Sequence, residues 1–376
     1  MLALPKKLNK LDLDLVKQKK DPIKSMKGMG LSYASDNDIS ISRQKKGKGF
    51  IYTYENGKLI TAKKIIKRIN SLRIPPAWDN VLICNNEHGH IQATGIDNRK
   101  RKQYIYHTDW EKLRSMHKFN SMIPFAKVLP DIRKQMEKDI QSRGLTKKKI
   151  VALVIQLIDL THIRVGNEEY AKENNSFGLT TFQNRHVEIE GDRVRFKFLG
   201  KSKVRHTYTI RNRQLAKIIR NCQEIEGQDL FQYYDENGDL QRITSSDINE
   251  YLQSITNLPI TAKDFRTWAG TTLGAKELHK IGPPETKKDA KKNFTLMVKN
   301  VSKQLGNTTS VCKKYYIHPA IEMTYIDHSL HKVFNEIMEK NITDTHLTPY
   351  ELGTFKIIDT YVKNTNVTAE QFTQNC

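Results

Sequence analysis

Alternating apolar and polar residues dominate the chain between about residue 50 and residue 110. Side chains with a period of two face opposite sides of a sheet, so this pattern predicts half-buried strands. We predict strands at Phe50–Tyr54, Asn80–Cys84, His90–Thr94 and Lys102–Tyr106, and a helix at Ala62–Leu72. Residues 50–117 are therefore expected to form a small β-rich domain.

The residues before this domain are basic and show little periodicity. They end in the Lys- and Gly-containing stretch Gln44–Gly49. We interpret residues 1–49 as a basic N-terminal arm that is partly ordered. Contact of the arm with phosphates and a solvated lead-in without such contact are both open at this stage.

From about Lys118 the apolar residues recur with the spacing of helices. In Leu145–Ile163 they form a broad face that includes Ile150, Leu153 and Leu157, and Thr146 is suited to cap the helix. Further helices are predicted at Asn212–Cys222, Ser245–Thr256, Ala262–Glu277, Ala290–Leu305, Ile321–Lys340 and, with a frayed end, Leu347–Cys376.

Three short alternating runs interrupt this helical region. Val187–Ile189, Arg193–Phe198 and His206–Ile210 predict a three-stranded meander whose second turn presents Lys201 at its tip. The whole pattern predicts an α+β fold. A small N-terminal β-rich domain is followed by a larger, mainly helical domain, residues 118–330, and by a helical extension, residues 331–376.

The charge of the chain indicates a class of binding partner. The chain has 63 Lys+Arg against 41 Asp+Glu, a formal net charge of +22, and the basic residues are spread along it. Such a balance favours binding to nucleic acid over binding to membranes or acidic proteins. An ordinary basic protein is the alternative that charge alone leaves open.

Other classes of protein are disfavoured by what the sequence lacks. No run approaches the roughly 20 apolar residues of a membrane span, and the apolar stretch at the N-terminus is too short for a secretory signal. Without a Walker loop or an acidic triad, neither a nucleotide nor a metal cofactor is expected. The cysteines lie far apart, which favours a reducing compartment and argues against structural zinc: Cys84, Cys222, Cys312 and Cys376.

Four residues together would suit the attack of a phenol on a phosphodiester. Arg164 and Arg266 offer planar forks that are always charged and match phosphate oxygens. Lys201 could protonate the departing 5′ oxygen if nearby cations lower its pKa. The same cationic surroundings would activate the phenol of Tyr316, since a free phenol has a pKa of about 10.

Each of these residues also has an ordinary interpretation. Arg164 could form a surface salt bridge with Glu168, and Lys201 could be a surface lysine at a turn. Arg266 lies among apolar residues on a predicted helix, and Asp264 is too close in sequence to face it well. The neighbouring Tyr315 leaves the choice of nucleophile open.

Four blocks in this order resemble those of type IB DNA topoisomerases of the compact poxvirus and bacterial kind. They are Ile163–Thr181, Phe198–Val204, Lys263–Thr267 and Gly306–Tyr316, and the resemblance runs from about Ile74 to Tyr325. It implies that residues 118–330 are the catalytic domain. It also implies that Arg164, Arg266 and Asn307 hold the phosphate, that Lys201 is the general acid, and that Tyr316 is the nucleophile.

The resemblance further implies residues that contact DNA. Gln103, Tyr104 and Tyr106 match the DNA-reading strand of the small domain, and Tyr170 in the large domain is expected near the DNA. An ordinary aromatic pair on one face of a strand is the alternative for Tyr104 and Tyr106.

Two departures from the family pattern matter. Poxvirus and cellular enzymes have a histidine where this chain has Asn307, whereas bacterial-like enzymes have asparagine. An amide can still donate a hydrogen bond to a phosphate oxygen but carries no charge. Asn167 replaces a lysine of the poxvirus block, so strict pentamer specificity is not expected to transfer.

The implied activity is relaxation of positive and negative supercoils through a transient 3′-phosphotyrosyl bond, without ATP or metal. The expected partner is double-stranded DNA, around which a monomer closes as a clamp. A bacterial source would place the protein in the cytoplasm with the nucleoid, and a viral source in the virion or host cell. Asn307 and the stretch Ile317–Pro319 favour the bacterial type.

The sequence leaves two other functions open. A tyrosine recombinase or integrase shares this chemistry, but it usually has His three residues before the second arginine, where this chain has Lys263. Its N-terminal domain is generally helical rather than β-rich. A non-enzymatic DNA-packaging protein would not need the ordered residues and would keep its function after Tyr316→Phe.

Overall fold

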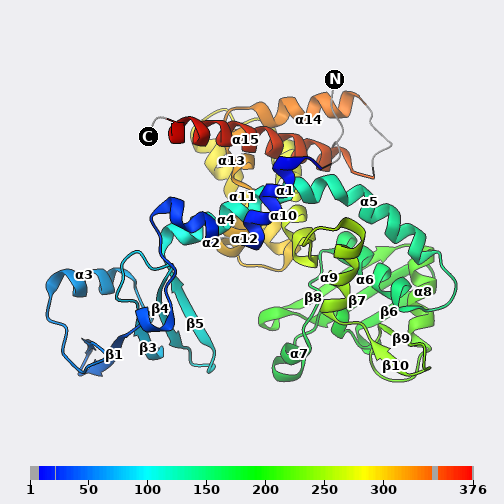
Figure 1. Ribbon diagram of the computed structural model, residues 1–376. Coiled ribbons are helices and arrows are strands. Elements are labelled where there is room, and N and C mark those ends of the chain that lie inside the picture. The colour runs from blue at the N-terminus through cyan, green and yellow to red at the C-terminus, as the bar shows by residue number, and fades with distance from the viewer. Residues whose placement is uncertain (1–7, 22, 341–345, 375–376) are drawn as a thin grey trace. The chain divides into compact units, whose positions relative to one another are not determined.

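The computed structural model describes residues 8–21, 23–340 and 346–374. The chain divides into two compact units, Asp14–Phe119 and a larger unit that combines Asn120–Cys376 with Met1–Leu13. Figure 1 shows that strands dominate the smaller unit and helices the larger one. The predicted α+β class is confirmed.

A five-stranded antiparallel sheet forms the centre of the smaller unit, with strand order β2-β1-β3-β4-β5. Helix α3 (Lys63–Ser71) packs on this sheet, and its Ile69 joins Ile41, Val81 and Ile83 in a buried core. The strands are β1 (Ile41–Lys46), β2 (Gly49–Thr53), β3 (Asp79–Ile83), β4 (Ile91–Ile96) and β5 (Lys102–Tyr106). Helices α1 (Lys10–Lys20) and α2 (Ile23–Met26) precede these strands in the sequence, and α4 (Thr108–Asn120) follows them.

Strand β1 lies in the stretch that the sequence pattern assigned to an arm, so the sheet begins before Phe50. Of its six residues only Ile41 is buried, and the rest are polar. Arg43 instead uses its guanidinium to donate hydrogen bonds to the carbonyls of Pro75 (3.1 Å) and Trp78 (2.6 Å). A strand held by its backbone pairing and one arginine has no apolar alternation, which is why the pattern did not reveal it.

Helices make up most of the larger unit. Thr146 caps α6 by accepting a hydrogen bond from the N–H of Lys149 (3.3 Å), as predicted, and Ile150–Ile158 are buried except for Gln156. The helices are α5 (Met122–Ile140), α6 (Lys147–Thr161), α7 (Glu168–Asn174), α8 (Arg213–Gln223), α9 (Ser245–Thr256), α10 (Ala262–Ile281), α11 (Lys287–Leu305), α12 (Thr309–Tyr316), α13 (Pro319–Ile326), α14 (Ser329–Glu339) and α15 (Pro349–Gln374).

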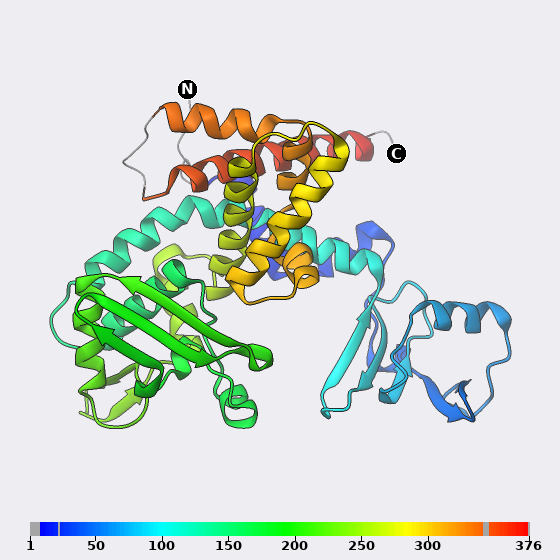
Figure 2. The ribbon, with the colours of Figure 1, turned by 180° about the vertical axis from the view of Figure 1, so that it is seen from behind.

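The predicted three-stranded meander is present as an antiparallel sheet of order β6-β7-β8. Its strands are β6 (Val187–Glu190), β7 (Arg193–Leu199) and β8 (Arg205–Arg211). Figure 2 shows this sheet in green, with β7 and β8 joined by a turn at one end. A short hairpin that the pattern did not predict, β9 (Gln232–Tyr234) and β10 (Leu240–Arg242), belongs to the same unit.

The single helix predicted for Ile321–Lys340 is wrong, because the chain breaks there into α13 and α14. His328 adopts a left-handed conformation (φ 66°), which ends the helical path. The carboxylate of Asp327 accepts hydrogen bonds from the N–H (2.9 Å) and hydroxyl (2.6 Å) of Ser329, and so satisfies a donor at the start of α14. The apolar residues keep a helical spacing across this break, so the sequence pattern did not predict it.

The C-terminal helices are part of the core of the larger unit. Leu330 and Phe334 of α14 and Ile357 of α15 are buried in a cluster with residues of α10 and α11. A Cβ at Gly353 would overlap the ring of Phe334, so α15 can lie against α14 only with glycine there. The end of the helix predicted for Leu347–Cys376 lies outside the described residues.

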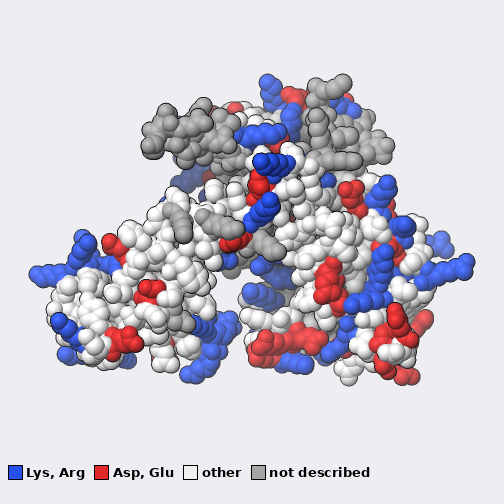
Figure 3. Space-filling view, viewed as in Figure 1, with Lys and Arg blue, Asp and Glu red and all other residues white. Residues whose placement is uncertain are grey.

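Basic residues occur over the surfaces of both units. Figure 3 shows Lys and Arg side chains interspersed with Asp and Glu on the visible faces. In the part of the chain that the structure describes, no helix is both long enough and apolar enough to cross a membrane.

Candidate active site

Arg164 follows the end of α6 and has a backbone that its neighbours hold in place. His162 takes a left-handed conformation (φ 57°) at the C-cap, which turns the chain out of the helix. The N–H of Leu179 donates to the carbonyl of Arg164 (3.0 Å). A Cβ at Gly178 would lie 2.6 Å from that carbonyl oxygen, so the close approach needs glycine.

The guanidinium of Arg164 points towards the loop between α11 and α12. Its Nη2 donates to the carbonyl of Gly306 (3.1 Å) and to Oδ1 of Asn307. Glu168, the partner that a surface salt bridge would require, pairs instead with Arg242 (3.5 Å). The structure therefore contradicts the ordinary interpretation of Arg164.

Arg266 lies on α10 and is 5% exposed. Its Nη1 donates to the carbonyl of His162 and its Nη2 to that of Leu305 (2.9 Å), so it joins the ends of α6 and α11. Asp264 is used elsewhere, because its carboxylate accepts from the N–H and hydroxyl of Thr261, each at 2.9 Å. The cation of Arg266 lies 5.6 Å from the centre of the Tyr316 ring.

Asn307 lies two residues before the short helix α12, and Tyr316 ends this helix. Gly306 ends α11 in a left-handed conformation (φ 60°), and Tyr316 is the last residue of α12. The carbonyl of Tyr316 accepts from the hydroxyl of Thr271 on α10 (2.9 Å). A Cβ at Gly270 would lie 2.7 Å from the same oxygen, which shows how closely α10 and the end of α12 approach.

Lys201 lies at the tip of the β7–β8 hairpin, where the sequence placed it. The turn Lys201–Lys203 has left-handed residues at Ser202 (φ 64°) and Lys203 (φ 58°), and the Lys201 side chain is exposed. A groove of about 760 Å³ is lined by Arg164, Lys201, Asn307 and Tyr316, among others. A smaller pocket is lined by Arg164, Lys201 and Arg266. The structure thus brings all five predicted residues together.

The charge of this site is unbalanced. Burial, and after it the positive charge of Arg266, lower the pKa of Arg164 to about 10. In the described chain, both guanidinium groups donate hydrogen bonds to carbonyl and amide oxygens. A buried cation next to a half-buried one is costly unless an anion joins them, so this groove is suited to a phosphate.

His206 is a residue of this groove that the sequence analysis missed. It lies on β8 and lines both pockets together with Arg164 and Lys201. Burial lowers its pKa, and the charges of Arg164 and Arg266 act in the same direction. In the sequence it is one position of an alternating strand, and nothing in that pattern distinguishes it from a structural residue.

The predicted DNA-contacting residues of the smaller unit lie on both faces of β5. Tyr104 and Tyr106 share one face, with ring centres 5.9 Å apart, and Tyr104 is 42% exposed. Gln103 shares the other face with Ile105, which packs on the core, and its Nε2 donates to Asp97 (3.0 Å). Tyr104 is therefore the most exposed of the three, because Gln103 and Tyr106 are both half-buried and Tyr106 packs against a buried cluster that includes Trp110.

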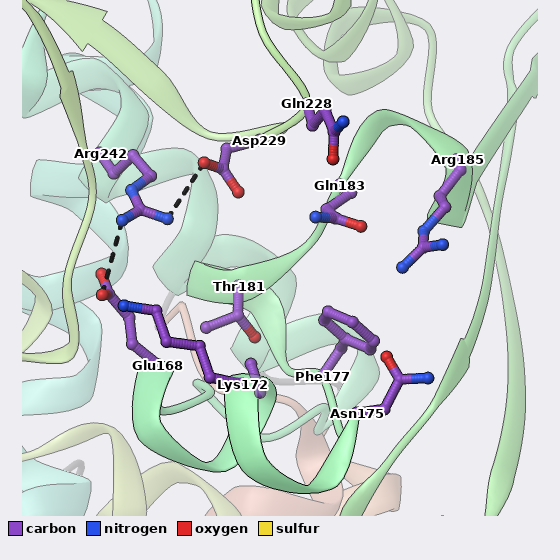
Figure 4. A pocket seen from close by; sticks show the side chains of 11 residues that line it. Glu168, Lys172, Asn175, Phe177, Thr181, Gln183, Arg185, Gln228, Asp229 and Arg242 are labelled. Carbon is purple, nitrogen blue, oxygen red and sulfur yellow. Dashed lines mark hydrogen bonds and ion pairs between the residues drawn. The ribbon is translucent and has the colours of Figure 1, made fainter.

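Tyr170 lies on α7 in the larger unit and is 43% exposed. Beside α7 is a pocket of about 550 Å³ (Figure 4). On one side of it Arg242 of β10 links Glu168 (3.5 Å) with Asp229 (3.1 Å), and Arg185 and Phe177 lie on another side. Because α7 is attached in part through this arginine, the hairpin β9–β10 contributes to the position of Tyr170.

Among the residues that the structure describes, no three His, Cys, Asp or Glu side chains are grouped so that they could hold a metal ion. The donor groups of the groove are cations and an amide, which bind anions rather than metals.

Comparisons with known proteins agree with this chemistry. Residues 100–342 match the family model described as eukaryotic DNA topoisomerase I, catalytic core. Residues 49–97 match that of the bacterial DNA topoisomerase IB, N-terminal domain.

Several named relatives align with the chain. DNA topoisomerase 1B of Acanthamoeba polyphaga mimivirus is 36% identical over 285 residues, which cover 74% of this chain and 84% of the relative. DNA topoisomerase 1B of Vaccinia virus (strain Copenhagen) is 22% identical over 316 residues, 78% of this chain and 94% of the relative. DNA topoisomerase 1 of Schizosaccharomyces pombe is 30% identical over 158 residues, 41% of this chain and 18% of the relative.

Proposed function

Because this chain belongs to the type IB DNA topoisomerase family, we propose that Tyr316, Arg164, Lys201, Arg266 and Asn307 are its catalytic residues. The family membership makes the protein a DNA topoisomerase whose substrate is DNA. One observation carries the assignment of residues. Two arginines whose hydrogen bonds in the described chain go to uncharged oxygens converge with Lys201 and Asn307 beside the tyrosine at the end of α12.

In the proposed cleavage step the phenol oxygen of Tyr316 attacks the phosphorus of one DNA strand. A bond from this oxygen to phosphorus forms, the bond from phosphorus to the 5′ oxygen breaks, and the phenol proton leaves to solvent. Arg164, Arg266 and Nδ2 of Asn307 would hold the non-bridging oxygens, where negative charge grows.

Lys201 is proposed to give its proton to the departing 5′ oxygen. The turn that carries it allows an ammonium group to reach into the groove without being locked in the core. The strand then rotates, and the 5′ hydroxyl attacks the phosphotyrosine to restore the original bond. One phosphodiester is exchanged for another, so no external energy source enters the cycle.

We also propose that a single chain closes around the duplex. This proposal is supported by basic side chains on the surfaces of both units and by the exposed Tyr104 and Tyr170. Affinity from phosphate contacts should fall steeply with salt. Sedimentation of the protein on a short duplex would measure whether one chain or more binds.

The tyrosine recombinase alternative is not supported, since the family models and the relatives reported above are all topoisomerases. Relatives covered over most of their length come from viruses, which suggests a viral or host-cell setting. Association with a bacterial nucleoid stays a proposal, and detecting the protein in purified virions or in nucleoid fractions would distinguish the two.

The proposed nucleophile can be tested with supercoiled plasmid in EDTA without ATP. The native chain should relax positive and negative supercoils, and Tyr316→Phe should lose this activity because no phenol oxygen can attack. Tyr315→Phe is the matched control and should relax both. Relaxation by Tyr316→Phe, or its loss in Tyr315→Phe alone, would assign the nucleophile elsewhere.

A further inference from the structure

The imidazole of His206 lies between two glycines of the site. A Cβ at Gly200 would lie 2.6 Å from Cδ2 of this ring, and a Cβ at Gly306 would overlap its Cε1. Both approaches are closer than side-chain carbons tolerate. Each glycine therefore keeps space for the ring.

These two glycines belong to the two parts of the site that must meet. Gly200 directly precedes Lys201 in the β7–β8 turn, and its N–H donates to the carbonyl of Val204 (2.8 Å). Gly306 directly precedes Asn307, and its carbonyl accepts from Arg164 (3.1 Å). The ring of His206 is thus the spacer between the segment that carries the proposed acid and the segment that carries the phosphate ligands.

Neighbouring aromatic rings fix the ring of His206. Its centre lies 5.3 Å from that of Phe198 and 5.8 Å from that of Tyr208, and both pairs are stacked. The hydroxyl of Tyr208 donates to the carbonyl of Gln304 (3.2 Å), which ties β8 to the end of α11 a second time. The hairpin therefore meets the α11–α12 loop through a defined contact.

We propose that His206 is a positioning residue, whose flat ring sets the place of Lys201 relative to Arg164 and Asn307. The inference rests on the proposed role of Lys201 as the general acid. Small displacements of a catalytic group are costly, since about 1 Å of misplacement can slow a reaction about 100-fold. A fault in proton donation should disappear when the leaving group needs no proton.

The experiment compares cleavage of a normal DNA duplex with cleavage of one that has sulfur in place of the bridging 5′ oxygen. His206→Ala should slow cleavage of the oxygen substrate about 100-fold and the sulfur substrate by less than about 3-fold. His206→Phe keeps a flat ring and should recover most of the rate on oxygen. Thr209→Ala, an exposed residue on the same strand, is the control and should match the native protein on both substrates.

Gly200→Ala tests the contact from the other side. The backbone of Gly200 has φ −92°, so alanine adds no strain there, but its methyl group would meet the His206 ring. The variant should show the same selective loss on the oxygen substrate. In the His206→Ala background the methyl should cost little more, because two residues that act through one contact are not additive.

The outcomes separate this inference from the function it rests on. If Lys201→Ala slows both substrates equally, Lys201 is not the acid and the proposed function needs revision. If sulfur relieves Lys201→Ala but not His206→Ala or Gly200→Ala, then His206 does not act through Lys201 and the inference fails. If His206→Ala and Gly200→Ala slow cleavage of the oxygen substrate additively in the double variant, the inference also fails. This test holds even if one of the single variants folds poorly.

Discussion

At the scale of single residues, the site is defined by cations whose hydrogen bonds go to uncharged groups. Arg266 is almost fully buried and donates to two backbone carbonyls, and Arg164 donates to a carbonyl and to the amide of Asn307. These contacts orient the guanidinium groups without cancelling their charge. The remaining charge is available to a phosphate, which is why the arrangement favours an anionic transition state.

The role of the Asn307 side chain can be tested by substitution. Its Oδ1 accepts from Arg164, while its buried Nδ2 has no hydrogen-bond partner within the described part of the chain. That N–H is free to donate to a phosphate oxygen, so Asn307→Asp should slow cleavage about 100- to 1,000-fold. The carboxylate would lose this donor and neutralise Arg164.

Single-turnover cleavage of a suicide duplex would measure this effect. Asn307→Ala, which removes the donor without adding charge, is the matched comparison and should be slowed less. Equal cleavage rates for Asn307→Asp and Asn307→Ala would mean that a negative charge at position 307 does not affect binding of the phosphate.

At the scale of elements, turns and short helices carry the functional side chains, and long helices hold them in place. Lys201 lies in a three-residue turn, Tyr316 ends the eight-residue α12, and Tyr170 lies on the seven-residue α7. None of the residues of α7, all of which the structure describes, is buried. Its position therefore depends on polar contacts rather than on a core.

Arg242 is the contact of α7 that can be removed most cleanly. Arg242→Gln should break its ion pairs with Glu168 and Asp229, and backbone amides of α7 should then exchange with deuterium faster than in the native protein. Global stability should change by less than about 1 kcal/mol, because exposed ion pairs contribute little. Hydrogen exchange followed by mass spectrometry gives the local rate.

The control for that experiment is Lys197→Gln, which breaks an exposed pair with Glu188 (2.8 Å) on the β6–β7 sheet. It should leave exchange in α7 unchanged. Unchanged exchange in Arg242→Gln as well would show that other contacts hold the helix.

At the scale of the whole larger unit, the C-terminal helices support the site through buried polar groups. Arg133 on α5 pairs with Asp159 on α6 and with Glu351 on α15, each at 2.8 Å. Burial alone would raise the pKa of Glu351, but the hydrogen bonds and charge of Arg133 lower it overall. Glu351 also accepts from the indole of Trp268 on α10 (3.1 Å), so one carboxylate joins α5, α10 and α15.

Stability of this unit should depend on pH through His318, which follows α12 and is 1% exposed. Burial lowers its pKa to about 3, whereas an unfolded histidine has a pKa of about 6.5. Between these values the unfolded chain binds more protons. His318 therefore destabilises the fold as pH drops below about 6.5, by up to about 1.4 kcal/mol per pH unit.

His318→Asn tests this dependence. Asparagine can still accept the hydrogen bond that Nδ1 of His318 takes from the N–H of Ala320 (3.0 Å), but it does not titrate. Urea unfolding at pH 4, 5 and 6 should show a shallower loss of stability for the variant than for the native chain. If the stability of the variant and of the native chain fell equally with pH, this prediction would be wrong. His318 would then be protonated already in the folded protein, or would be solvated on protonation without cost.

Several features of this protein follow from the sequence alone. Periodicity is a local property, so α6 with its Thr146 cap, the β6–β7–β8 meander and the α+β class could be predicted. The order and spacing of the blocks around Arg164, Lys201, Arg266, Asn307 and Tyr316 likewise predicted the family.

Other features were decided only by the tertiary structure. Strand β1 depends on pairing with β2 and β3, and α7 on an arginine from a distant hairpin, and neither leaves an apolar pattern. His206 acquires its place only where Gly200 and Gly306, 106 residues apart in the sequence, approach the same ring. Contacts between distant residues depend on how helices and strands pack, and local propensity contains no information about that packing.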